Sequence, residues 1–201
     1  MAALENQNVK TSKSMPTNIT IRPLPTDQFE DRPEGTKVDT LIIHSMHNPE
    51  AKDRFSALSC KECLDKHGVS SHYMIDCNGT VWQSVPENKK AWHAGASSMP
   101  EDGREGVNAF SIGIELIGTE DTDFTEAQYQ TLALLTQDIL SRHPLQYIYG
   151  HCDIALGRKT DPWGLDWSRY RKDVLCSCPD AVLWFPQAAS TAPNAKPTFE
   201  K

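Results

Sequence analysis

Two histidines and one aspartate are the residues of this 201-residue chain whose types and spacing point most directly to chemistry. His44 ends the apolar run that starts at Val38. His151 and Asp161 bracket a short loop, in which Gly157 allows the chain to turn back. Two imidazoles and one carboxylate fill three tetrahedral positions around zinc and leave the fourth to water, whereas a structural zinc site is closed. The set therefore predicts one catalytic Zn²⁺ ion.

Each of these residues alone has an ordinary alternative interpretation. A buried histidine on a strand is commonly a hydrogen-bonded core residue, and Asp161-Pro162 by itself would indicate a turn. Pro162 favours an extended backbone at Asp161 and disfavours a helical one. The metal prediction therefore depends on the three side chains meeting in the fold.

A carboxylate inside an apolar strand is the next candidate. In the segment 111–117, strand alternation places Ser111, Gly113 and Glu115 on one face and three apolar residues on the other. We expect Glu115 to act beside the metal, and Gly113 to leave open space for a water or substrate. The alternative is a buried salt bridge between Glu115 and Arg158 or Lys159.

Lys159 is a candidate for stabilising negative charge. It precedes Asp161 by two residues, so on an extended segment both side chains point the same way. Its ammonium group would then lie near the metal and could stabilise the oxyanion of a tetrahedral intermediate, a contribution of about 3 to 4 kcal/mol per donor. The alternative is a solvated surface lysine.

Strands and helices are mixed along the chain. We expect strands at residues 38–44, 71–77, 80–85, 110–117 and 145–149. We expect helices at residues 53–66, from 125 up to Pro144, and at 166–175. Asn78-Gly79 predicts a hairpin, Gly68 a helix C-cap, and Thr125 with Gln128 a capping box. The pattern predicts an α/β fold with a single domain, in which a mixed central β-sheet is flanked by helices.

The ends of the chain differ in composition from its middle. Residues 1–35 are polar and interrupted by prolines, which predicts a loosely structured arm wrapped on the domain. Residues 36–180 form the expected catalytic domain, and 201 residues suit one domain with tails. Residues 186–201 are rich in Pro, Ala, Ser and Thr without periodicity, which predicts a flexible tail.

Charge and hydropathy exclude some classes of binding partner and some cellular locations. A net charge of −7 and a pI near 5.5 argue against nucleic acid, whose binding relies on Lys and Arg. No apolar stretch reaches the roughly 18 to 20 residues of a membrane span. The N-terminus lacks the basic and apolar regions of a secretory signal. We therefore expect a cytoplasmic protein, or a periplasmic one if a leader has been removed.

Six cysteines are too few for a disulfide scaffold. Cys60 with Cys63, and Cys176 with Cys178, are the suggestive pairs. A second, structural zinc and a disulfide in the tail are the alternatives. We expect ordinary reduced or buried thiols.

Five stretches, in this order along the chain, carry a family resemblance. They are Ile42–His44, Ser70–Asp76, Ala91–Gly95, Ser111–Glu115 and Gly150–Pro162. Together they resemble the zinc-dependent N-acetylmuramoyl-L-alanine amidases of the type-2 (AmpD-like) family, which share their fold with phage amidases and peptidoglycan-recognition proteins. The resemblance covers residues 38–175.

The resemblance implies roles for particular residues. The zinc ligands would be His44, His151 and Asp161. Glu115 would activate the water and shuttle its proton, and Lys159 would help to stabilise the intermediate. Tyr73 falls where some members place a tyrosine near the metal. The segments that line the substrate groove in family members contain His93, Asn108 and Arg158.

The sequence departs from many members at one place, where Trp163 follows Asp161-Pro162 and precedes Gly164. This bulk next to a ligand puts the substrate preference in question more than metal binding. Trp82 and Trp92 could pack against sugar, although a core position is the more ordinary role for tryptophan.

The expected function is hydrolysis of the amide bond between N-acetylmuramic acid and L-alanine. The partners would be peptidoglycan fragments or muropeptides, and we expect a monomer. One alternative is a recognition module that binds muropeptides without cutting them, although such relatives usually lose a zinc ligand. The other is a zinc peptidase acting within the stem peptide, but the chain has no H-E-x-x-H helix.

Overall fold

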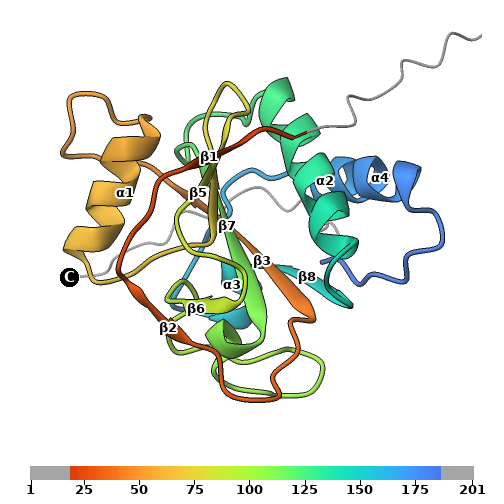
Figure 1. Cartoon of the computed structure of the whole chain (residues 1–201). Coiled ribbons are helices and arrows are strands. Elements are labelled where there is room, and N and C mark those ends of the chain that lie inside the picture. The colour runs from red at the N-terminus through yellow and green to blue at the C-terminus, as the bar shows by residue number, and fades with distance from the viewer. Residues whose placement is uncertain (1–18, 187–201) are drawn as a thin grey trace, which may run out of the picture.

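A mixed β-sheet is the centre of the molecule (Figure 1). The computed structural model describes residues 19–186, so the predicted tail lies outside the described residues except for Pro186, as do residues 1–18 of the predicted arm. The sheet has six strands in the order β1-β5-β4-β7-β3-β8. Their bounds are β1 Ile21–Pro23, β5 Val81–Gln83, β4 Tyr73–Ile75, β7 Ser111–Ile117, β3 Thr40–Met46 and β8 Tyr147–Gly150. Neighbours run parallel except β4 and β5, which form the predicted hairpin.

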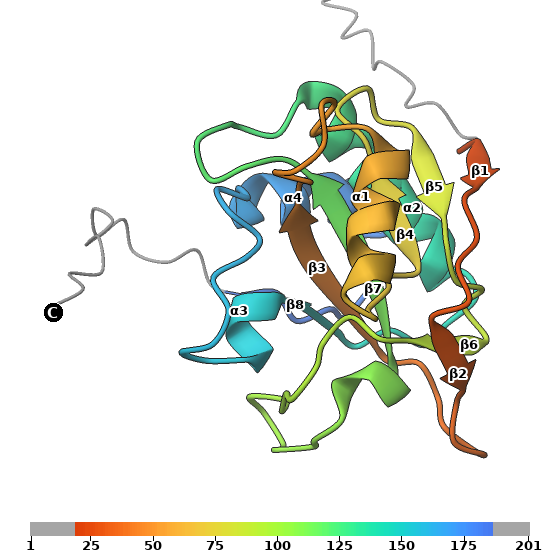
Figure 2. The same cartoon turned by 90° about the vertical axis from the view of Figure 1, so that its left-hand side faces the viewer.

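Helices cover both faces of this sheet, as the sequence predicts. Helix α1 (Ala57–Lys66) lies on one face, and α2 (Glu126–Leu140) and α4 (Trp167–Ser177) lie on the other (Figure 2). Two short elements, the 3₁₀ helix η1 (Val107–Ala109) and α3 (His151–Ile154), complete the helices of residues 19–186. The fold is therefore the expected single α/β domain. No helix within residues 19–186 is long and apolar enough to cross a membrane.

Local sequence signals explain where the helices begin. The predicted capping box opens α2: the Thr125 hydroxyl accepts from the Gln128 amide at 3.1 Å, and the Gln128 side chain accepts from the Thr125 amide at 3.0 Å. Gln128 also donates to the Ile117 carbonyl at 2.9 Å, which fixes α2 against the end of β7. Ser56 caps α1, so this helix starts later than the predicted residue 53.

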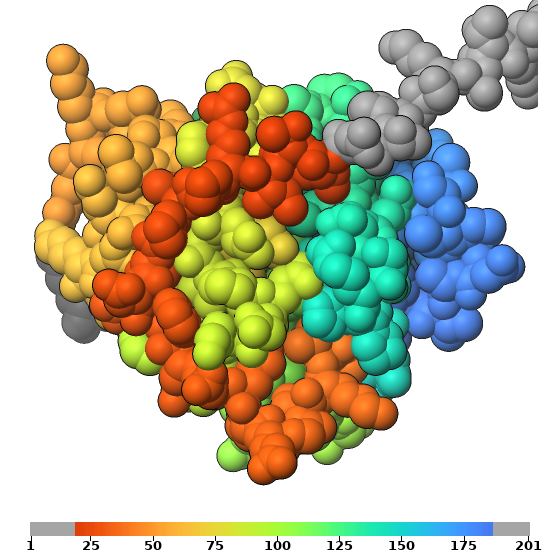
Figure 3. Space-filling view, viewed as in Figure 1, coloured from red at the N-terminus to blue at the C-terminus, as the bar shows by residue number. Residues whose placement is uncertain are grey.

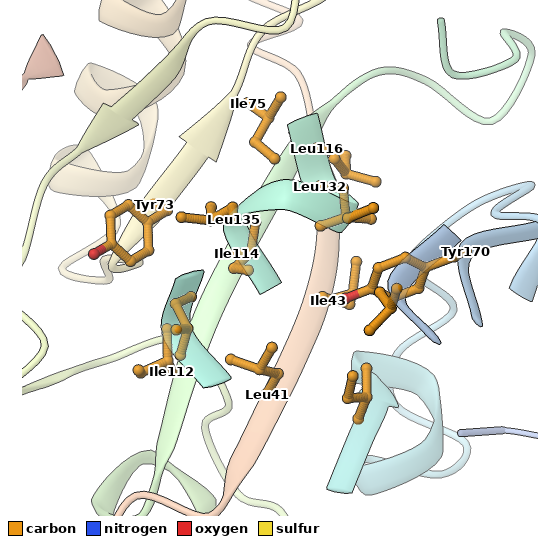
Figure 4. Packing of buried hydrophobic residues seen from close by; sticks show 14 of the residues in the cluster. Leu41, Ile43, Tyr73, Ile75, Ile112, Ile114, Leu116, Leu132, Leu135 and Tyr170 are labelled. Carbon is orange, nitrogen blue, oxygen red and sulfur yellow. The ribbon is translucent and has the colours of Figure 1, made fainter. Parts of the chain in front are cut away.

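The main core lies between the sheet and the helix pair α2 and α4. It is built from alternate residues of the central strands and the inner faces of both helices (Figure 4). Its fully buried members include Leu41, Ile43, Ile112, Ile114, Leu132, Leu135 and Tyr170. Burying one such side chain stabilises the fold by about 1.5–3 kcal/mol relative to leaving it exposed. This face of the sheet is entirely occupied by packing.

The opposite face has two smaller apolar clusters. One surrounds Ile42 near α3 and η1, and the other surrounds Met74 and Ile117 beneath α1. Between them lie Gly113 and two polar residues of the central strands, His44 and Glu115. The apolar packing is thus interrupted in the middle of this face.

Part of the predicted N-terminal arm is regular structure. Within residues 19–35, β1 pairs with β5, and β2 (Phe29–Asp31) pairs antiparallel with β6 (Lys89–Ala91). Figure 3 shows this segment lying across the surface of the strands that follow residue 80. Arg32 anchors it by donating to the carbonyls of Ala109 and Ser111 at 2.6 and 2.8 Å. Residues 19–35 are thus wrapped on the domain as expected (Figure 3), but they contain two short paired strands, which the prediction of a loosely structured arm missed.

Candidate metal centre and active site

Adjacent parallel strands bring the first two candidate residues together. His44 on β3 and Glu115 on β7 are direct register partners, so both side chains leave the same face of the sheet at the same level. Strand β3 runs on to Met46, so His44 lies within the strand and not at its end as predicted. His44 is 2% exposed and Glu115 is 6% exposed.

A closed loop returns Asp161 to the side of His151. Strand β8 ends at Gly150, and His151 is the first residue of α3. The Cys152 amide donates to the Asp161 carbonyl at 2.9 Å, which closes the loop between the two candidate ligands. Since β8 pairs with β3, this loop lies beside His44.

Three side-chain atoms from these elements converge. His44 Nδ1 lies 3.0 Å from His151 Nδ1 and 3.4 Å from Asp161 Oδ2, and His151 Nδ1 lies 3.2 Å from Asp161 Oδ2. Tetrahedral ligands 2.0–2.1 Å from a zinc ion are separated from one another by about 3.3 Å. The triangle of ligand atoms therefore has the size that a tetrahedral zinc site requires.

The protonation of these groups also fits a cation. His151 Nε2 faces the Ala94 carbonyl at 3.2 Å, and because a carbonyl can only accept, Nε2 carries a hydrogen and the lone pair of a neutral ring is on Nδ1. Burial lowers the pKa of His44 to about 4, which keeps this imidazole neutral. Asp161 Oδ2 faces the same two Nδ1 atoms, so a carboxylate there would share a bound ion with both imidazoles. Neutral imidazole and carboxylate are the forms that bind zinc.

One oxygen of the Glu115 carboxyl group has no partner among the described residues. Its Oε2 is buried and has no hydrogen bond within residues 19–186. Burial, reinforced by the charge of Asp161, raises the pKa of Glu115 well above its usual value, and Lys159 acts in the opposite direction. The alternative of a salt bridge with Arg158 or Lys159 is therefore not what the structure shows. A carboxyl group with a raised pKa beside a metal site is suited to transferring protons.

Lys159 lies at the exposed rim of this site. It lines the same cavity as the candidate ligands, and its charge acts on the pKa of both His44 and Glu115. The cavity has a volume of about 320 Å³. Apolar side chains form much of its remaining wall, namely Met46, Leu64, Val69, Trp92 and Trp163. The first three were not expected from the sequence, because nothing local shows that the end of α1 faces β3.

Tyr73 is not near the metal site, so this prediction is wrong. Its strand neighbour Met74 is the register partner of Glu115, and alternation therefore directs Tyr73 to the opposite face. There the tyrosine packs in the main core beneath α2 (Figure 4). Its hydroxyl donates to Glu87 at 2.8 Å.

The three predicted groove residues all border the cavity, and each also makes hydrogen bonds within the protein. Asn108 accepts from the amides of His93 and Ala94 at 3.1 and 2.8 Å. Arg158 donates to the carbonyls of Ala94 and Ala96 at 2.8 and 2.7 Å. Both side chains thus hold the segment that follows Trp92, and binding of substrate by these residues stays a prediction.

His93 is 8% exposed and lies against His44. It also occupies the space that we expected Gly113 to leave for water or substrate, since a Cβ at position 113 would lie 2.5 Å from His93 Cγ. The open space predicted beside Glu115 on its own strand is therefore absent.

The cysteines form no second metal site within the described residues. All six thiols are free, and His44, His151 and Asp161 are the one group within residues 19–186 that could hold a metal ion. Burial raises the pKa of the Cys60 thiol to about 12.

Trp82 lies outside the cavity, where its indole donates to Asp76.

An open His-His-Asp site beside an unpaired carboxyl group, on a mixed sheet, has the features of a metal-dependent hydrolase. The comparison with protein families agrees: residues 34–164 match the family described as N-acetylmuramoyl-L-alanine amidase. The chain belongs to this family.

Two curated relatives illustrate the similarity. The chain is 35% identical over 181 residues to the 1,6-anhydro-N-acetylmuramyl-L-alanine amidase AmpD of Salmonella typhimurium, covering 79% of this chain and 92% of the relative. It is also 35% identical to the N-acetylmuramoyl-L-alanine amidase AmiD of Escherichia coli, covering 72% of this chain and 56% of that protein.

Solved structures share the fold. The crystal structure of a selenomethionine derivative of AmpD is 36% identical, with a TM-score of 0.67, and covers 77% of this chain and 94% of that one. The Escherichia coli AmiD complex with anhydro-N-acetylmuramic acid-L-Ala-D-γ-Glu-L-Lys is 31% identical, with a TM-score of 0.57. That match covers 71% of this chain and 60% of the AmiD chain.

Proposed function

We propose that this chain is a zinc-dependent amidase that hydrolyses the bond between N-acetylmuramic acid and L-alanine in muropeptides. One observation carries the proposal: three buried ligand atoms converge at 3.0–3.4 Å beside the unpaired carboxyl group of Glu115. His44, His151 and Asp161 would hold the ion. When bound, zinc would polarise the scissile carbonyl and lower the pKa of a coordinated water to about 7.

Glu115 has the position and the pKa for proton transfer. As the attacking water forms its bond to the carbonyl carbon, the Glu115 carboxylate would accept the water's proton. The same group would then donate this proton to the departing alanine nitrogen, and burial, which raises its pKa, favours the protonated form that this step needs. The amide nitrogen then leaves as a neutral amine.

Lys159 would act on the other side of the reacting group. Its side chain borders the cavity together with Asp161, so its ammonium group can approach the carbonyl oxygen as that oxygen gains negative charge. Preorganised positive charge at this point stabilises the transition state more than the neutral amide substrate.

The proposed substrate is a 1,6-anhydro-muropeptide. The AmpD relatives, whose names specify this sugar, align with the present chain over 92% of their length, compared with 56% for AmiD. The solved AmiD structure also contains an anhydro-N-acetylmuramic acid peptide. Trp163 borders the cavity beside Asp161, and its backbone amide donates to Ser45 at 3.0 Å. It is the residue through which this chain would differ from relatives in substrate preference.

Product analysis tests this proposal. Purified protein would be incubated with anhydro- and reducing-end forms of one muropeptide, with zinc or with a chelator, and the products identified by mass spectrometry. We expect a free stem peptide and an intact sugar in the zinc sample, with faster release from the anhydro form. Smaller peptide fragments would instead indicate a stem peptidase, and binding without cleavage would indicate a recognition module.

Two further proposals can be tested separately. We propose that the protein is a monomer, which light scattering coupled to gel filtration would measure. We also propose that it works in the cytoplasm, which cell fractionation with a periplasmic marker enzyme would test.

A further inference from the structure

His93 forms a contact with His44 that the proposed mechanism does not use. His44 Nε2 and His93 Nδ1 are 3.0 Å apart, and this contact lies on the side of the His44 ring away from Asp161. The other nitrogen of His93, Nε2, lies 3.1 Å from the Ser111 hydroxyl. The two rings meet edge to face, with centroids 5.1 Å apart. Both nitrogens of His93 are therefore engaged inside the protein.

The hydrogen bond that Ser111 donates determines which atoms donate in the contacts of His93 and His44. Ser111 is fully buried, and its hydroxyl donates to the Val107 carbonyl at 2.7 Å. A hydroxyl has one hydrogen, so towards His93 it can only accept. His93 Nε2 must then carry a hydrogen, and in a neutral ring His93 Nδ1 is left as an acceptor.

This arrangement determines the tautomer of His44. Since His93 Nδ1 accepts, His44 Nε2 is the donor, and the lone pair of the neutral His44 ring is on Nδ1. His44 Nδ1 is the atom that faces His151 and Asp161. We propose that His93 is a positioning residue, which holds His44 in the tautomer and orientation that bind the metal, with Ser111 setting the proton on His93.

The backbone at position 113 is shaped to accept this ring. Gly113 is in the middle of β7, where glycine costs roughly 0.5–1 kcal/mol relative to alanine. A Cβ there would lie 2.5–2.8 Å from three atoms of the His93 ring, closer than side chains approach one another. The absence of a side chain at this position thus gives His93 its place behind His44.

The two candidate histidine ligands are therefore supported by different groups. His151 donates to a backbone carbonyl, a common partner of metal-binding histidines, whereas His44 donates to a second imidazole. A neutral imidazole adds no negative charge behind the ligand. This inference rests on the proposed zinc centre, but the tautomer of His44 can be measured without metal.

Two substitutions of equal shape separate the positioning role from a structural one. His93→Asn retains an acceptor oxygen where Nδ1 lies, and His93→Leu has the same branching without an acceptor. We expect His93→Leu to weaken zinc binding about 10- to 100-fold, the usual effect of removing a ligand's hydrogen-bond partner. His93→Asn should remain close to the wild type. Zinc affinity would be measured by competition with a chromophoric chelator, with thermal unfolding of both variants as a control.

Nitrogen NMR of the metal-free wild-type protein provides a test that does not depend on the variants. We expect the Nε2 of His44 to carry the hydrogen and its Nδ1 to have the shift of an unprotonated nitrogen. The opposite tautomer overturns the inference even if the protein binds zinc and cleaves muropeptides. Equal zinc affinity of His93→Leu and wild type, combined with a higher KM, would also overturn it and assign His93 to the substrate groove.

Absence of zinc binding by the wild type contradicts the proposed function itself. The NMR result still decides the tautomer in that case, so the two failures are distinguishable. If His93→Leu does not fold, the NMR result and the His93→Asn variant test the inference.

Discussion

Replacing Glu115 with glutamine is the sharpest test of the proposed chemistry, because it removes the acid without changing its shape. Glu115 is 6% exposed and its Oε2 has no hydrogen-bond partner within residues 19–186, so no ion pair is broken by the change. General acid–base catalysis contributes about 10²- to 10⁴-fold to rate. This corresponds to about 2.7–5.4 kcal/mol of transition-state stabilisation. We expect Glu115→Gln to lose this much of kcat/KM while zinc affinity stays unchanged.

The same substitution should lower activity but increase the stability of the metal-free protein above pH 4.5. Burial raises the pKa of Glu115 well above 4.5 in the folded protein. Between pH 4.5 and that higher pKa, the folded state holds a proton that the unfolded state has released, so wild-type stability falls as pH rises. Glutamine cannot ionise, so the metal-free variant should become increasingly stable relative to the metal-free wild type as pH rises above 4.5.

Two measurements check this pair of effects. Initial rates on a defined muropeptide, read by chromatography, give the loss of activity for protein with verified zinc content. Urea unfolding of both metal-free proteins, at pH 5 and at pH 8, gives the difference in stability. A variant with wild-type turnover would falsify the assignment of Glu115 as the proton-transfer group. A stability difference that is independent of pH would refute the reasoning about its burial.

Three other predictions follow from the site and its surroundings. Asp161→Asn should abolish zinc binding and activity together, because it removes the anionic ligand; equilibrium dialysis against zinc measures this, and full retention of metal would contradict the ligand assignment. Tyr73→Phe should leave kcat unchanged and reduce the free energy of unfolding by about 1.5–3 kcal/mol, the usual value of a hydrogen bond to a charged group, because the hydroxyl donates to the Glu87 carboxylate; a large fall in kcat in a stably folded variant would argue against the observed facing of β4. Burial opposes ionisation of Glu87, but hydrogen bonds from Arg142, Tyr73 and His143 lower the pKa of this carboxyl to about 2. The ionised Glu87 should therefore stabilise the fold above pH 4.5, and this stabilisation should be lost as pH falls towards 2. Acid unfolding of Glu87→Gln beside the wild type measures this, and identical pH profiles would refute it.

The positions of the candidate ligands and of Glu115 could be predicted from the sequence because local pattern determines their placement. Both central strands are long and apolar, and alternation along each strand assigns His44 and Glu115 to definite faces. The loop from His151 to Asp161 is short, so its two candidate ligands could not lie far apart. Such features need no knowledge of distant contacts.

Tyr73 could not be placed in this way. Strand β4 is buried on both faces, so apolar residues occur at successive positions and alternation does not reveal which face is which. Only the pairing of Met74 with Glu115 on β7 decides it. The packing of the His93 ring against Gly113 could not be predicted for a similar reason. It joins a loop to a strand, and the sequence alone does not show that these two segments are in contact.

The N-terminal strands show the same limitation. Each has three residues, and β1 ends at a proline, so neither has the length or pattern of a predictable strand. They exist because β5 and β6 offer free edges and because Arg32 reaches the carbonyls around η1. Structure that depends on a partner elsewhere in the chain leaves little trace in local composition.

The charge balance of the site explains why an amide is a suitable substrate. Among the proposed ligands only Asp161 is negative, because burial keeps His44 neutral and the Ala94 carbonyl fixes His151 as a lone-pair donor. A divalent ion held by one carboxylate retains net positive charge, and the neutral His93 behind His44 does not compensate it. With zinc bound, that charge and Lys159 at the rim would favour a reaction in which a neutral carbonyl oxygen becomes an anion. A second carboxylate in place of His93 would reduce this advantage, so His93→Asp should bind zinc at least as tightly as wild type and yet turn over more slowly, and a rate equal to or above the wild type would refute the argument.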